Sequence, residues 1–302
     1  MADTRLKETE YKEFGKCVEI SNGTVSLLVT VESGPRIIRY GFVGKDNMFC
    51  EKSRDSKPSL GGDFKIRGGH RLWHSPEQMP RTYIPDNNPV QWHTIENGIS
   101  VTQETEKWTQ IKKEMEISLN PSKNRVKIVH KLTNKNAWPV EYAVWALSMM
   151  APGGLQVIPQ PRRDTGLLPN RMISLWPYSK MNDERVCWGE KYILFKQIPG
   201  MAPPFKLGLP NEDGWVAYFN YGSLFIKRFS FIESAKYLDY GSSYETYTDD
   251  CMMEMESLSP LNEVMPDATI SHVEEWDLID GVDKPRDESE IEAIVKKYIK
   301  VK

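Results

Sequence analysis

The sequence has few cysteines and no long apolar run. The four cysteines stand at scattered positions, Cys17, Cys50, Cys187 and Cys251. With no CxxC pair and no framework spacing, they indicate reduced thiols and a cytoplasmic setting. The longest apolar stretch, residues 142–151, is about half the length of a membrane-spanning helix, and the charged first residues lack the apolar core of a signal peptide. We therefore expect no association with a membrane.

The chain also lacks an excess of charge of one sign. Its 302 residues include 39 basic and 42 acidic side chains, a formal net charge of −3. Binding to a phosphate backbone needs a basic stripe, so nucleic acid is not an expected partner. The GxSxG, GxxxxGK[ST], GxGxxG and HExxH signatures are missing as well. We expect neither a metal nor a cofactor.

Short runs of alternating polarity dominate what is present. Ile111, Met115, Ile117 and Leu119 share one parity with charged residues between them, which is typical of a half-buried strand. After the five residues NPSKN the alternation resumes at residues 126–132, which predicts a β-hairpin. At least a dozen such runs, separated mainly by Gly and Pro, predict an all-β chain of antiparallel strands.

The C-terminus is the exception to this pattern. Asp287 and Glu290 form a capping-box pattern, and the apolar residues that follow have helical spacing. No repeat or low-complexity linker divides the chain. We predict a single domain over residues 1–302, with the β-structure in 15–280 and a C-terminal helix in 287–302.

The densest group of polar and aromatic residues is GGHRLWHSPEQMPRTYIPDNNPV, residues 68–90. On a strand His70 and His74 share one face, and Arg71 and Trp73 share the other. Two imidazoles on one face are able to hold a metal or to act as acid and base. Because no third ligand stands at a recognisable spacing, we do not expect a zinc site.

The second half of the same segment indicates a long irregular loop, and long loops are often functional. Its Glu77 and Tyr83 offer hydrogen-bonding groups of the kind that recognise hydroxyls, as does Arg71, while Trp73 offers a stacking face.

A pair of carboxylates stands in CMMEMESLSPL, residues 251–261. On a strand Glu254 and Glu256 share a face, and Met253 and Met255 point the other way. Either both carboxylates are solvated, or at least one lines a cleft where burial tunes a general base.

The order of these motifs along the chain resembles the aldose 1-epimerase (galactose mutarotase) superfamily. The resemblance rests on GPRIIRYGF, MFCE, GGHRLWHSPE, a strand ending in LTN, MEMESLSP and SHVEEWDL, and covers residues 15–280. It is strongest to a branch of the superfamily marked by GGHRLWxxPE. The resemblance implies an antiparallel β-supersandwich that binds a sugar or sugar derivative in an open cleft.

The resemblance also implies residue roles. In the family a glutamate takes a proton from the anomeric hydroxyl, and it corresponds to Glu254. One family histidine falls near His70, but the position of the acid histidine carries Trp145, which cannot donate an imidazolium proton, so His74 or His70 would have to supply the acid. Substrate-binding roles are expected for Arg71, Trp73, Glu77, Tyr83, Trp145 and Glu256.

Three functions stay open from the sequence. The first is a carbohydrate-binding, aldose 1-epimerase-like isomerase with Glu254 as base and His74 or His70 as acid. The second is a non-catalytic carbohydrate-binding protein in which Trp145 stacks on a pyranose. The third is a supersandwich glycosidase or lyase module. A site with Glu254 and at least one of the two histidines favours the enzyme, and a site with only aromatic and amide groups favours the binding protein.

Overall fold

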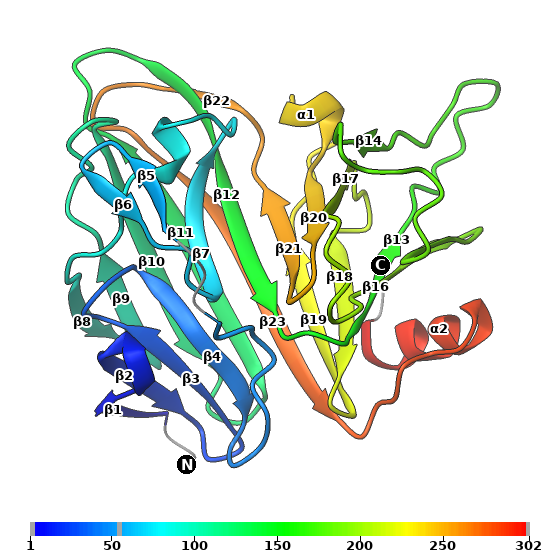
Figure 1. The fold of residues 1–302 in the computed structure, drawn as a ribbon, viewed down its shortest axis with the longest axis horizontal. Coiled ribbons are helices and arrows are strands. Elements are labelled where there is room, and N and C mark those ends of the chain that lie inside the picture. Colours follow the sequence, from blue (N-terminus) through cyan, green and yellow to red (C-terminus); the bar gives the residue numbers. More distant parts are fainter. Residues whose placement is uncertain (1–3, 53–55, 300–302) are drawn as a thin grey trace.

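Two large β-sheets lie face to face in the computed structural model, which describes residues 4–52 and 56–299 (Figure 1). The first sheet has 11 strands, in spatial order β1 (Arg5–Glu10), β2 (Lys16–Ser21), β3 (Val25–Thr30), β4 (Arg36–Phe42), β7 (Gly69–Ser75), β12 (Val140–Met150), β21 (Met253–Leu258), β20 (Tyr244–Thr248), β17 (Phe205–Leu209) and β14 (Ser174–Leu175), with β22 (Asn262–Val264) paired to β12.

The second sheet has ten strands, in spatial order β15 (Val186–Trp188), β16 (Tyr192–Lys196), β13 (Leu155–Pro159), β18 (Trp215–Asn220), β19 (Ser223–Phe229), β23 (Thr269–Asp280), β11 (Arg125–Asn134), β10 (Ile111–Leu119), β9 (Gly98–Thr102) and β8 (Gln91–Ile95). A separate hairpin joins β5 (Lys57–Ser59) to β6 (Gly62–Phe64). Neighbouring strands run antiparallel throughout these sheets. The predicted fold class is therefore confirmed.

The main hydrophobic core fills the space between the two large sheets. Strand β10 alternates buried and half-buried residues, and its Ile111, Met115, Ile117 and Leu119 all enter this core. Ile117 lies opposite Ile128 of β11, and five residues join the two strands. The hairpin expected from the alternation of polarity is confirmed, because one face of each strand has to leave water.

Helical structure is short. It comprises α1 (Leu238–Gly241), α2 (Glu288–Ile294) and the single turns η1 (Lys12–Phe14), η2 (Arg81–Tyr83) and η3 (Val295–Ile299). Asp287 caps α2 by accepting a hydrogen bond from the backbone N–H of Glu290 at 3.0 Å, as the capping box predicted. Ile291 and Ile299 pack with Trp215 on the face of the second sheet that points away from the first.

The last three residues of the predicted helix, 300–302, lie outside the described residues. None of the described helices is long and apolar enough to cross a bilayer.

Candidate functional site

Strand β7 sends its side chains alternately to the two faces of the first sheet. Leu72 enters the core between the sheets, and His70 and His74 on the same side of the strand are 0% and 1% exposed. Arg71 and Trp73 therefore point to the outer face of the sheet, away from the second sheet. One strand thus supplies the interior with imidazoles and the outer face with a cation and an indole.

The register of the neighbouring strands lines up further charged groups on this outer face. On β21 the methionines enter the interior core, so Glu254 and Glu256 point outward. Glu256 lies opposite Glu245 of β20, and Glu254 lies opposite Tyr247. Tyr247 in turn lies opposite Lys206 of β17. Cross-strand pairing thus gathers residues from distant parts of the sequence on one face.

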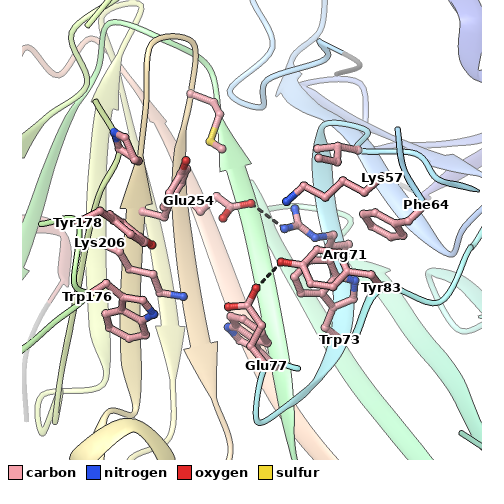
Figure 2. A pocket seen from close by; sticks show the side chains of 15 residues that line it. Lys57, Phe64, Arg71, Trp73, Glu77, Tyr83, Trp176, Tyr178, Lys206 and Glu254 are labelled. Atoms are coloured by element: carbon pink, nitrogen blue, oxygen red, sulfur yellow. Dashed lines mark hydrogen bonds and ion pairs between the residues drawn. The ribbon is translucent and has the colours of Figure 1, made fainter. Parts of the chain in front are cut away.

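A pocket of about 360 Å³ lies on this face (Figure 2). Its walls come from β7 and the loop that follows it, β12, β17, β20, β21, the β5–β6 hairpin and the segment after β14. It is lined by Lys57, Phe64, Ile66, Arg71, Trp73, Glu77, Tyr83, Trp145, Trp176, Tyr178, Pro204, Lys206, Tyr247, Met252 and Glu254.

An ion pair between Arg71 and Glu254 lies in the wall of the pocket. Arg71 Nη2 donates to Glu254 Oε1 at 2.7 Å, and the two side chains are 7% and 11% exposed. Arg71 Nε and Nη1 have no hydrogen-bond partner among the described residues. The guanidinium lies over the ring of Trp73, with Cζ 4.2 Å from the centroid. Its two free nitrogen donors and the second carboxylate oxygen are the groups that a ligand can satisfy.

Aromatic rings form most of the remaining wall. The Trp73 and Trp145 rings lie 5.4 Å apart, and Tyr83 lies 5.1 Å from Trp73. The ammonium of Lys206 lies 4.8 Å from the Trp145 ring centroid and 4.5 Å from that of Trp176. These rings give the pocket several flat apolar faces beside its charged groups.

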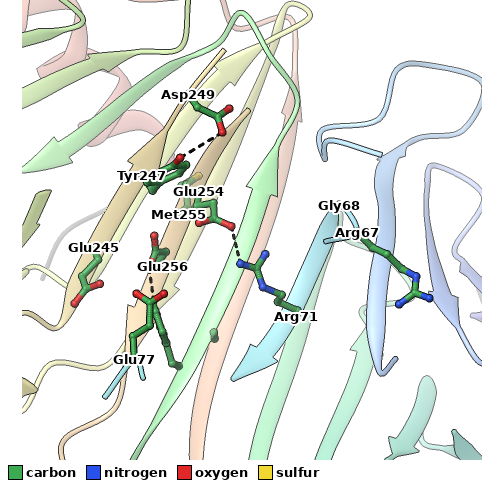
Figure 3. Close-up of polar contacts among 12 residues, drawn as sticks. Arg67, Gly68, Arg71, Glu77, Glu245, Tyr247, Asp249, Glu254, Met255 and Glu256 are labelled. Atoms are coloured by element: carbon green, nitrogen blue, oxygen red, sulfur yellow. Dashed lines mark hydrogen bonds and ion pairs between the residues drawn. The ribbon is translucent and has the colours of Figure 1, made fainter. Parts of the chain in front are cut away.

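Beneath these rings Lys206 holds two buried glutamates. Its Nζ lies 2.7 Å from Glu245 Oε2 and 3.0 Å from Glu256 Oε2, and Trp145 Nε1 donates to the same Glu256 oxygen at 3.0 Å. The Oε1 atoms of both glutamates have no partner among the described residues. Figure 3 shows the two carboxylates on neighbouring strands.

Burial raises the pKa of Glu256 to about 7 and that of Glu245 well above its usual range, although Lys206 opposes both shifts. Burial lowers the pKa of Lys206, but the two carboxylates outweigh burial and raise it. One ammonium thus stabilises two carboxyl groups that hold protons more tightly than free glutamates.

The loop after β7 closes one side of the pocket. Tyr83 in η2 donates its hydroxyl to Glu77 Oε1, and burial raises the Tyr83 pKa. Figure 2 shows this pair facing the Arg71–Glu254 ion pair. The loop therefore contributes a carboxylate and a phenol to the same pocket.

Six of the residues expected at a site line this pocket together: Arg71, Trp73, Glu77, Tyr83, Trp145 and Glu254. Three do not. His70 and His74 are buried on the opposite face of β7, so neither reaches a ligand in the pocket and the expectation that one acts as its acid is corrected. Glu256 is buried behind Trp145 and Lys206, where it binds these side chains instead of a ligand.

The sequence prediction missed several residues of the site. They include Lys57, Phe64, Trp176, Tyr178, Lys206 and Glu245. Lys206 did leave a signal, since it is a charged residue inside the otherwise apolar strand FKLGL. Glu245 stands in strand β20, and the others stand in loops and short hairpins with no periodic pattern.

Within the described residues, two groups of side chains have donor atoms close enough to hold a metal ion. His70, His130 and Glu274 meet between the sheets, but Glu274 already binds Lys227 Nζ at 2.8 Å. A metal cation would have to compete with that ammonium. The second group is Asp249, Asp250 and Cys251 beside β20, where Asp249 Oδ1 already accepts from the backbone N–H of Cys251 at 3.1 Å.

The two packed antiparallel sheets resemble the fold of solved galactose mutarotase-like proteins. A Klebsiella pneumoniae protein proposed to be an aldose 1-epimerase aligns over 98% of this chain and 87% of its own, with a TM-score of 0.61 and 13% identity. A galactose mutarotase-like protein from Clostridium acetobutylicum aligns over 92% of this chain and 99% of its own, with a TM-score of 0.52 and 10% identity. The superfamily resemblance is thus confirmed at the level of fold.

A TPR-domain containing protein from Parabacteroides distasonis also shares the fold, with a TM-score of 0.61 and 13% identity over 90% of this chain. The chain spans about half of that protein, since the alignment covers 48% of its length. No protein-family model and no curated protein sequence matches the chain.

Proposed function

We propose that the pocket on the outer face of the first sheet binds a sugar ring, and that the protein acts as a carbohydrate-binding protein. The observation that carries this proposal is the ring of indoles around one buried, partly unsatisfied ion pair, Arg71–Glu254. Aromatic faces stack on the apolar C–H face of a sugar, and charged groups hydrogen-bond its hydroxyls. A volume of about 360 Å³ falls within the usual range of small-ligand pockets.

The balance of charge supports a neutral sugar. Lys57 and Arg71 line the pocket together with Glu77 and Glu254, two groups of each sign. The charge of Lys206 is met by the two glutamates beneath it. No excess of either sign selects an ionic ligand, whereas alternating donors and acceptors suit a polyol.

Isomerase activity of the aldose 1-epimerase type is the second candidate function. It is favoured by one observation, the carboxylate of Glu254 in the pocket wall. Ring opening also needs an acid in the same pocket. None of the described lining residues is a histidine, and Trp145 stands where the resemblance expects the acid. This second observation favours sugar binding without catalysis.

The binding proposal is tested by titrating the protein with a panel of neutral aldoses and their methyl glycosides in isothermal calorimetry. Trp176→Ala removes a half-buried indole of the pocket and should weaken the best ligand on the order of tenfold. Trp188→Ala is the matched control, because Trp188 is 40% exposed on β15 and does not line the pocket. Equal losses in the two variants, or no binding of any sugar, would contradict the proposal.

Catalysis is tested on the sugar that binds. Exchange between its two anomers is measured by NMR exchange spectroscopy with wild type and with Glu254→Gln. An isomerase should lose a factor of about 10² in exchange rate in the variant, because the amide cannot accept the hydroxyl proton. A wild-type protein that binds the sugar but leaves the exchange at its uncatalysed rate is a binding protein.

A further inference from the structure

A second cavity lies on the other side of the same strand and loop. It has a volume of about 320 Å³. Its wall includes His74 from the interior face of β7, and Arg81 and Ile84 from the loop whose Glu77 and Tyr83 face the sugar pocket. Strand β7 and the residues after it therefore separate two cavities.

The inner end of this second cavity contains polar atoms without partners. His74 is 1% exposed and Tyr142 of β12 is 0% exposed, with their rings 6.4 Å apart. Both ring nitrogens of His74, the hydroxyl of Tyr142 and Nε of Arg81 have no hydrogen-bond partner among the described residues. Buried polar groups are rarely left unpaired, because each one loses its bonds to water on folding.

The outer rim of the cavity is formed by large apolar side chains that face solvent. Trp108 is 58% exposed, Trp138 is 63% exposed and Leu60 is 40% exposed. Exposed indoles beside a concave site are typical of ligand and partner sites. The cavity therefore has apolar faces at its mouth and hydrogen-bonding groups at its base.

The charges around the cavity favour an anion. No aspartate or glutamate is among the described lining residues, and Arg81 forms no ion pair within the described part of the chain. Arg81 Nη2 donates to the carbonyl of Pro76 at 2.7 Å, which fixes the guanidinium but does not neutralise it. Burial, together with the charges of Lys113 and Arg81, lowers the pKa of His74 well below its usual range. A neutral imidazole offers one donor and one acceptor.

We propose that this cavity is a second ligand site, which takes a small ring compound bearing a carboxylate. The carboxylate accepts from Arg81 Nε, the Tyr142 hydroxyl and one N–H of His74, and the ring packs against Trp108 and Trp138. The site is independent of the sugar pocket in its contacts. A ligand in it contacts Arg81 and Ile84, which belong to the same loop as Glu77 and Tyr83.

The proposal is tested by following the indole N–H signals of Trp108 and Trp138, assigned with Trp→Phe variants, in ¹H–¹⁵N NMR titrations. Glucuronate and benzoate are the probes, and glucose is the control that has a ring without a carboxylate. We expect saturable shifts of both signals with at least one acid and none with glucose. A response to glucuronate alone identifies a sugar acid, and a response to benzoate alone identifies an aromatic acid.

Variants separate this site from the sugar pocket. Tyr142→Phe keeps the shape of the core and should weaken the acid about fivefold to tenfold, and Arg81→Gln should weaken it by at least about tenfold. Trp176→Ala, in the sugar pocket, should leave acid binding unchanged. The proposal is overturned if neither acid shifts the two signals, if glucose shifts them equally, or if Tyr142→Phe and Arg81→Gln bind the acid as wild type does.

Discussion

Lys206 and Lys227 are both buried lysines bonded to glutamates, but their surroundings differ. Lys227 lies between the sheets, where its Nζ is 2.8 Å from Glu274 Oε1 and donates to the carbonyl of Met255 at 2.8 Å. The other Glu274 oxygen accepts from Trp276 Nε1 at 2.8 Å. Each oxygen of this buried carboxylate therefore has a donor.

Three histidines extend the Lys227 cluster across the interior. His70 Nε2 and His130 Nε2 are 2.7 Å apart, and His130 Nδ1 lies 3.0 Å from the carbonyl oxygen of His272. His272 Nε2 lies 2.7 Å from the hydroxyl of Ser257. These contacts join β7 and β21 of one sheet to β11 and β23 of the other, so the cluster connects the two sheets.

The Lys206 cluster on the outer face is incomplete by comparison. One ammonium there meets two carboxyl groups, and an oxygen of Glu245 and an oxygen of Glu256 have no partner among the described residues. Fully satisfied polar networks rigidify a core, whereas partly satisfied ones retain protons and binding capacity. The comparison indicates that the interior cluster stabilises the packing of the two sheets, whereas the outer cluster sets the charge and protonation of the wall of the pocket.

Of the changes considered, acidification should have the largest effect on stability, because it acts on the histidines of the interior cluster. Burial lowers the pKa of His130 and His272 to about 3 and that of His70 well below its usual value. Below about pH 6.5 these histidines bind protons in the unfolded chain but stay neutral in the folded protein. Their contribution to the free energy of unfolding is therefore complete above about pH 6.5 and is lost as the pH falls below it. At about 1.4 kcal/mol per histidine and pH unit, the three should lower the free energy of unfolding by about 6 kcal/mol between pH 7.5 and 5.0.

Urea denaturation at a series of pH values measures this loss. His272→Gln should remove about a quarter of the acid sensitivity that the buried histidines cause, because burial also lowers the pKa of His74 and one of four such groups is gone. His93→Gln is the control, since His93 is exposed on β8. Identical acid sensitivity in wild type and His272→Gln would contradict the assignment.

Removal of the interior ammonium should have the next largest effect. Lys227→Met leaves Glu274 buried without its cation and should lower the free energy of unfolding at pH 7.5 by about 3–5 kcal/mol. Lys45→Met is the matched surface variant, because the Lys45–Asp280 pair is 54% and 51% exposed. It should lower the free energy by less than about 1 kcal/mol in the same urea measurement. Similar losses in the two variants would contradict a structural role for the interior pair.

The outer cluster should respond to pH in the opposite direction. The pKa of Glu256 is raised to about 7 by burial, so the folded protein binds this proton before the unfolded chain does. The contribution of Glu256 to the free energy of unfolding therefore grows as the pH falls from 7 toward the ordinary pKa of a glutamate. Between pH 7.5 and 5.0 it grows by about 2 kcal/mol. Glu256→Gln should lose this gain and be more acid-sensitive than wild type in urea denaturation. If the free energy of unfolding changes with pH in the same way in wild type and Glu256→Gln, the raised pKa of Glu256 is contradicted.

The sequence predicted those parts of the structure that depend on periodicity. Alternation along residues 69–75 separates Arg71 and Trp73 from the two histidines, and alternation in β21 places Glu254 opposite its methionines. It does not say which face meets the second sheet, because both faces of these central strands are buried. The sequence therefore did not show that His70 and His74 face the interior while Arg71 and Trp73 face the pocket.

Residues that reach the pocket from irregular segments could not be predicted in the same way. Trp176 follows a two-residue strand, and Lys57 stands in a short separate hairpin. Their positions depend on how loops fold over a completed sheet, which local pattern does not encode. The pairing of Lys206 with Glu245 depends on strand order, a property of the whole fold.

The indoles of the pocket on the outer face are also intrinsic fluorescent probes of that pocket. Of the nine tryptophans in the chain, Trp73, Trp145 and Trp176 line this pocket. Lys206 holds a positive charge within 5 Å of two of these rings, at 4.8 and 4.5 Å from their centroids. A ligand that enters between them changes both the polarity and the local field at the rings. Ligand binding in the pocket should therefore change the wavelength and the intensity of intrinsic tryptophan fluorescence, so that no attached label is needed to measure it.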